Sequence, residues 1–122
     1  MYSPNSFLPD STLIGAANES IENAENYFSN QNYPQCANEV ARAAINLSRR
    51  DSPSSGQRGM NIIRACGLSL DEFSTFKSRL PEAKPLGDTN VLVTKNPQID
   101  RETAEFLLNY IKELISRIQG LQ

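Results

Sequence analysis

The stretch DRETAEFLLNYIKELISRIQG, from Asp100 to Gly120, decides the fold. Its apolar residues recur three or four positions apart, which places them on one face of an α-helix. Asp100 suits the cap of such a helix, and Ile99 with Ala104 can form a hydrophobic staple around it. The apolar face is too wide to be left in water, so other helices must cover it. Its members are Ala104, Leu107, Leu108, Ile111, Leu114, Ile115 and Ile118.

The N-terminal half supplies two covering helices. The spacing of apolar residues predicts one helix from about Ser11 to Ser29, capped by Asp10 or Ser11, and a second from Pro34 to about Arg50. The segment SNQNYP between them is rich in Asn and contains Pro, which are turn residues. Two amphipathic helices joined by so short a turn form an antiparallel helical hairpin.

The middle of the chain predicts two shorter helices. DSPSSGQ, residues 51–57, is a flexible break, after which a helix runs from about Arg58 to Cys66 and ends at Gly67. SLDE, residues 69–72, has the spacing of a capping box, and the helix that it starts is stopped by Pro81.

Residues 81–98 predict a long link between these helices and the last one. They contain three prolines, and NVLV, residues 90–93, favours an extended backbone. A single four-residue strand does not make a sheet, so we expect no sheet here.

These elements predict an all-α protein, an antiparallel bundle of four to five helices. The length of 122 residues suits one domain, which we place at residues 10–120. Residues 1–9 form a short flexible lead, with Phe7 and Leu8 available to pack where the chain enters the domain.

The composition argues against most enzyme classes, although carboxylates, Lys or Tyr could still serve in catalysis. The chain has no histidine, so it lacks the commonest general base and the Ser–His and Cys–His nucleophile pairs. It also lacks a phosphate-binding loop and a calcium loop. Two cysteines, Cys36 and Cys66, are too few for a zinc site and lie in apolar helical patterns, so we expect two buried thiols in a reducing cytoplasm. We therefore expect no enzyme activity, no cofactor and no metal.

The apolar runs are also too short for a membrane protein. None approaches the roughly 20 residues that a spanning helix needs, and the N-terminus lacks the basic start and apolar core of a secretory signal. We therefore expect a cytoplasmic protein with no membrane segment.

Charge is distributed unevenly along the chain. Residues 1–41 contain no Lys or Arg, whereas residues 42–95 contain nine basic and five acidic residues. This segregation indicates one acidic and one basic face. Solvated helix faces are the simpler explanation, and a surface that binds polyanions is the functional one. The candidate anion-binding or nucleic-acid-binding residues are Arg42, Arg49, Arg50, Arg79 and Lys84.

Two of these cations flank a helix-breaking proline in FKSRLPEAK, residues 76–84. Arg79 can grip a phosphate through two hydrogen bonds, and Lys84 can add a point charge, so the pair favours binding over proton transfer. The helix dipole offers a structural explanation, because Lys77 and Arg79 lie in the last turn of a helix whose C-terminal end attracts cations. This explanation does not apply to Lys84, which lies beyond Pro81.

Three segments together resemble the HEPN family of helical domains: NYPQCANEVARAAINL (32–47), FKSRLPEAK (76–84) and IDRETAEFLLNYIKELISRI (99–118). The resemblance implies a helical bundle of the kind common in prokaryotic defence and toxin–antitoxin systems, where many members dimerise and cleave RNA. The family's catalytic signature is Arg, four to six residues, then His. Arg79 matches the Arg, and Lys84 stands where the His would be. A lysine is mostly protonated near neutral pH and replaces imidazole poorly as a base.

The resemblance therefore implies a non-catalytic HEPN-like module that acts in protein–protein or subunit interaction, as a homodimer or in a hetero-complex with a protein partner. One alternative is a nucleic-acid-binding small helical subunit of an RNA-guided complex, with RNA as the partner. Another is a variant ribonuclease that uses Arg79, Lys84 and Arg42.

Overall fold

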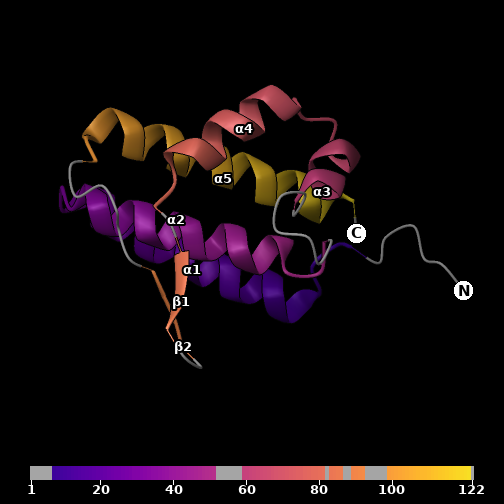
Figure 1. The fold of residues 1–122 in the computed structure, drawn as a ribbon, viewed down its shortest axis with the longest axis horizontal. Helices are drawn as coiled ribbons and strands as arrows, with labels where there is room; N and C mark the ends of the chain where they lie inside the picture. The colour runs from indigo at the N-terminus through magenta and orange to yellow at the C-terminus, as the bar shows by residue number, and fades with distance from the viewer. Residues whose placement is uncertain (1–6, 52–58, 82, 87–88, 93–98, 122) are drawn as a thin grey trace, which may run out of the picture.

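The structure, a computed structural model, describes residues 7–51, 59–81, 83–86, 89–92 and 99–121, and of the two segments 83–86 and 89–92 only the backbone. Within these residues five helices pack around one core, which confirms the predicted all-α bundle (Figure 1). A small two-stranded hairpin projects from the bundle. The elements are α1 (Ser11–Ser29), α2 (Tyr33–Ser48), α3 (Met60–Ala65), α4 (Leu70–Arg79), β1 (Ala83–Leu86), β2 (Thr89–Leu92) and α5 (Arg101–Gly120).

Helices α1 and α2 form the predicted antiparallel hairpin and lie side by side along their lengths (Figure 1). Asp10 caps α1, since its carboxylate accepts a hydrogen bond from the backbone N–H of Leu13 at 2.9 Å. The α1 bounds agree with the prediction. Helix α2 begins one residue earlier than predicted, because Asn32 rather than a later residue is its cap, and it ends at Ser48.

Helix α5 packs against both helices of this hairpin. Asp100 caps it by accepting a hydrogen bond from the N–H of Thr103 at 2.8 Å. All seven residues of the predicted apolar stripe are buried, and so are Ile99 and Ala104, the predicted staple pair. The C-terminal stripe is therefore the part of the core that joins α5 to the hairpin.

Helices α3 and α4 are joined by a tight turn that packs them against one another. Gly67 has a φ of +71°, and the N–H of Leu68 donates to the carbonyl of Ile63, the pattern of a Schellman cap. Ser69 then caps α4 by accepting from the N–H of Glu72 at 3.4 Å. The C-terminal end of α3 and the start of α4 agree with the prediction. Helix α3 begins at Met60 rather than at about Arg58, because Gly59 before it has a left-handed backbone.

The expectation that residues 81–98 contain no sheet is wrong. Ala83–Leu86 and Thr89–Leu92 pair antiparallel, with Leu86 opposite Thr89 and Ala83 opposite Leu92. The sequence signal was the Gly-Asp pair at positions 87–88, because two such residues between short extended runs favour a hairpin. Strand β2, which contains Val91, therefore pairs with β1, the strand that precedes it in the chain.

The ends of two predicted flexible segments belong to the core. Leu8 is 4% exposed and lies in the hydrophobic cluster, so packing starts before Asp10. Asp51, predicted to begin a flexible break, is fully buried. Residues 1–6 and 52–57 of these segments lie outside the described residues.

Candidate functional site

A polar groove runs between α1 and α2 and contains two of the predicted cations. Arg42 and Arg49 both belong to its wall, Arg42 from within α2 and Arg49 from the residue after it, and both side chains are exposed. They are seven residues apart, so they lie on the same side of the helix about 10 Å from each other along its axis. The groove has a volume of about 350 Å³. It is lined by Ala16, Glu19, Ser20, Asn23, Glu39, Arg42, Ile45, Asn46 and Arg49.

The charges of the polar groove are balanced and unpaired. Glu19 and Glu39 stand against Arg42 and Arg49, so the charged lining sums to zero. None of the four forms an ion pair or a side-chain hydrogen bond within the described part of the chain. The groove therefore offers both donors and acceptors to a molecule outside the chain.

The other three predicted cations are arranged differently. Arg50 follows Arg49 beyond the end of α2 and is exposed, but it does not line the groove. Lys84 is the second residue of β1, and its side chain lies outside what the structure describes. The anion-binding pair of Arg79 and Lys84 thus stays a prediction.

Arg79 has partners at the junction of α4 and α5. Its guanidinium lies 4.9 Å from the centre of the Phe106 ring, within cation–π range. It also acts on Asp100, whose pKa is lowered mainly by hydrogen bonds from the side chain and backbone of Thr103, with a smaller electrostatic contribution from Arg79. Arg79 therefore has a structural role at this junction, and the structure describes no contact between it and the arginines of the groove.

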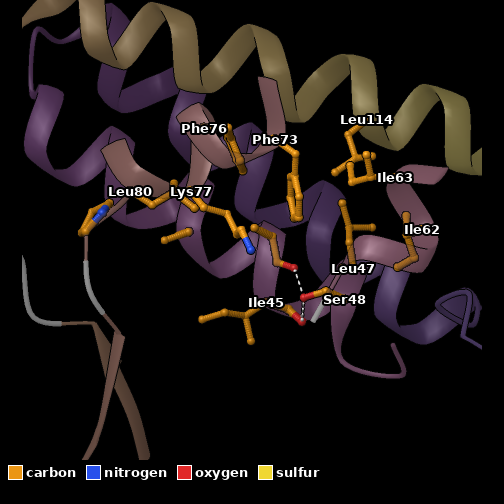
Figure 2. A pocket seen from close by; sticks show the side chains of 14 residues that line it. Ile45, Leu47, Ser48, Ile62, Ile63, Phe73, Phe76, Lys77, Leu80 and Leu114 are labelled. Atoms are coloured by element: carbon orange, nitrogen blue, oxygen red, sulfur yellow. Dashed lines mark hydrogen bonds between the residues drawn. The ribbon is translucent and has the colours of Figure 1, made fainter. Parts of the chain in front are cut away.

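A second hollow, which the sequence does not predict, is an apolar pocket between α2, α3 and α4 (Figure 2). Its volume is about 200 Å³, and Lys77 is the one charged residue among the described residues that line it. Figure 2 shows the Lys77 side chain reaching over the opening towards Ser48. The lining residues are Ala41, Ala44, Ile45, Leu47, Ser48, Gly59, Ile62, Ile63, Phe73, Phe76, Lys77, Leu80, Pro81 and Leu114.

One wall of the apolar pocket depends on a glycine. Gly59 has a φ of +92°, and a Cβ atom there would lie 2.8 Å from the Cζ atom of Phe73. The Phe73 ring therefore lies directly against the backbone at the start of α3. No apolar repeat in the sequence signals this arrangement, because it arises where three helices meet.

The two cysteines are free, buried thiols, as predicted. Burial raises the pKa of Cys36 to about 11 and also raises the pKa of Cys66, which Arg117 partly opposes. Both therefore stay protonated near neutral pH and are poor nucleophiles. Among the described residues no group of three or more His, Cys, Asp or Glu side chains could hold a metal ion.

Comparison with protein-family models, with curated proteins and with solved structures finds no match for this chain. Within the described part of the chain, no helix is both long and apolar enough to cross a membrane.

Proposed function

We propose that this domain is a non-catalytic helical interaction module that associates with a second copy of itself through the polar groove. The observation that carries this proposal is the set of four unpaired charges, two of each sign, on one face of the α1–α2 hairpin. These side chains lie on neighbouring helices but form no ion pairs with one another. They are therefore available to a partner that carries the opposite charges.

The charge balance favours a protein partner over a nucleic acid. A surface that binds RNA or DNA draws its affinity from an excess of cations that neutralise phosphates. The two glutamates of the groove cancel its two arginines and would repel a phosphate backbone. A protein surface carries both signs, so it can satisfy all four side chains together.

A second copy of the chain is the simplest such surface. Two-fold interfaces use the same patch on both subunits, so the patch must be complementary to itself. With two copies antiparallel across the groove, Arg42 and Arg49 of each copy face Glu19 and Glu39 of the other. Ala16 and Ile45 supply apolar area between the charges. The resemblance to HEPN domains, many of which dimerise, agrees with this arrangement.

A charge-swap experiment tests the interface. One variant carries Arg42→Glu and Arg49→Glu, and the other carries Glu19→Arg and Glu39→Arg. Each alone places like charges opposite one another and should dissociate at least tenfold more readily than wild type in sedimentation equilibrium. Mixed in equal amounts, the two variants should form a heterodimer as strong as the wild-type dimer.

The control is Arg64→Glu, because Arg64 is exposed on α3 and does not line the groove. This variant should associate like wild type. A monomeric wild type at high concentration, or two swapped variants that each keep its dimer, would contradict the proposed interface. RNA binding that weakens with salt and disappears in the arginine variant would instead favour the nucleic-acid-binding alternative.

The absence of catalysis and the cellular setting are parts of the same proposal. The chain has no histidine, and Lys84 would have to act as the base of any site like that of the HEPN ribonucleases. We therefore expect purified protein to leave RNA intact. Cleavage that an Arg79→Ala, Lys84→Ala variant lacks would overturn this expectation. Capture of bound proteins from the native host tests the defence or toxin–antitoxin setting that the HEPN resemblance supports.

A further inference from the structure

We propose that the apolar pocket between α2, α3 and α4 binds a small monocarboxylate with an aliphatic chain of about six to eight carbons. The chain lies among the apolar walls, and the carboxylate meets the ammonium group of Lys77. This inference does not rest on the proposed dimer, because the apolar pocket shares only Ile45 with the polar groove.

The walls of the pocket match an aliphatic chain. Apart from Ser48 and Lys77, the described residues that line it are apolar, and they come from four different helices and the turns beside them. An apolar cavity of about 150 Å³ holds a molecule the size of benzene. The volume of this pocket, about 200 Å³, therefore admits one short chain and is too small for a row of side chains from a partner helix.

The Ser48 hydroxyl and the Lys77 ammonium group differ in their ability to bind the carboxylate of a ligand. The hydroxyl of Ser48 donates to the backbone carbonyl of Ala44 at 2.8 Å within its own helix, so its proton is already used (Figure 2). Lys77 forms no ion pair within the described part of the chain, and its Nζ atom lies 4.7 Å from the centre of the Phe73 ring. Because Phe73 is itself a wall of the pocket, this contact holds the ammonium group, which has no ion-pair partner among the described residues, at the edge of the apolar surface.

The apolar walls together with the Lys77 ammonium group determine which charge of ligand the pocket prefers. An apolar pocket binds a chain of either charge equally, but a cation at its mouth attracts an anionic head group and repels a cationic one. Lysine stems also cover apolar surface without any ligand. Covering apolar surface and binding an anionic head group are therefore two possible roles of Lys77. Only the binding role makes the preference for anions depend on Lys77.

The test uses three probes of equal chain length: octanoate, octanol and octylammonium. Binding is followed through the methyl NMR signals of Ile62, Ile63 and Ala44, which line the pocket. Octanoate should bind saturably and about fivefold more tightly than octanol, and octylammonium should bind more weakly than both. From butanoate to octanoate each added methylene should tighten binding about threefold to fourfold, until the pocket is full.

Two variants and a control separate the contributions. Lys77→Met should remove the preference for octanoate while leaving octanol binding unchanged. Ala44→Phe should fill the pocket and abolish binding of all three probes, with its circular dichroism spectrum confirming the fold. Lys112→Met, the same change at an exposed lysine outside the pocket, should behave as wild type.

Three results would overturn the proposal. The first is the absence of saturable octanoate binding by the wild type. The second is equal affinity for octanoate and octylammonium. The third is unchanged octanoate binding in folded Ala44→Phe, which would place the probe elsewhere on the protein. None of these results bears on the charge-swap experiment, so the two proposals fail separately.

Discussion

The carboxylate of Asp51 accepts a hydrogen bond from the backbone N–H of Ile62 at 3.2 Å, eleven residues further along the chain. It also accepts one from the side chain of Asn61 at 2.8 Å. The residue before α3, Gly59, has no side chain with which to cap the helix. Asp51 thus provides the cap from the end of α2, and its negative charge also faces the positive end of the α3 dipole.

Replacing Asp51 should destabilise the whole domain. Asp51→Ala leaves the N–H of Ile62 without its partner and opens space at a fully buried position, so it should lower the free energy of unfolding by about 3 kcal/mol in urea titration. Asn61→Ala, which removes one of the two hydrogen bonds, should cost about 1 kcal/mol. An Asp51→Ala variant as stable as wild type would show that the buried carboxylate does not hold α3.

Gly59 and Gly15 form a matched pair of glycines with opposite expectations. Gly59→Ala combines a left-handed backbone with a Cβ atom 2.8 Å from Phe73, so it should cost about 2 kcal/mol or more. Gly15 lies inside α1 with open space around it, so Gly15→Ala should stabilise by about 0.5–1 kcal/mol. Thermal melts of both variants provide the measurement. A neutral Gly59→Ala would mean that Phe73 moves away easily.

Tyr110 carries a buried hydroxyl with no hydrogen-bond partner among the described residues. Its ring stacks on Phe76 at a centroid distance of 4.4 Å. Tyr110→Phe keeps the stacking and removes the unsatisfied group. We therefore expect a gain of up to about 1 kcal/mol in chemical denaturation. Tyr33→Phe, at a partly exposed ring, is the control and should change stability little. A loss of stability in Tyr110→Phe would imply a partner for the hydroxyl.

Cys36 should make the protein sensitive to alkali. Burial raises its pKa from 9.0 to about 11, so the unfolded chain loses this proton first as the pH rises. Stability from this group is complete below pH 9 and is lost as the pH approaches 11, with a slope of at most about 1.4 kcal/mol per pH unit. Cys36→Ala should flatten the stability profile over this range. Equal slopes for wild type and variant would contradict the assignment.

Much of the helical architecture was predictable because its signals are local. Asp10, Ser69 and Asp100 each stand before an amphipathic run, and each caps the helix that follows it. Spacing of apolar residues then identifies the buried face without knowledge of the partner helix. The hairpin of β1 and β2 was missed because each strand alone is four residues long, and its sequence signal was the Gly-Asp pair between the two runs.

The two hollows were less predictable. The charge of Arg42 and Arg49 predicts a binding role, but their balance against Glu19 and Glu39 depends on how α1 packs on α2. The apolar pocket depends on the meeting of α2, α3 and α4, for which a single sequence carries no signal. The buried position of Asp51 is of the same kind, because its partners are ten and eleven residues away.

Ile45 lines both the polar groove and the apolar pocket, so one side chain is shared by two surfaces that differ in chemistry. A ligand that changes the rotamer of Ile45 from one side changes the shape offered on the other. Thermodynamic linkage makes such an effect reciprocal: if octanoate strengthens self-association by some factor, self-association strengthens octanoate binding by the same factor. If the protein binds a ligand in the pocket and associates through the groove, Ile45 would link the occupancy of the pocket to the oligomeric state.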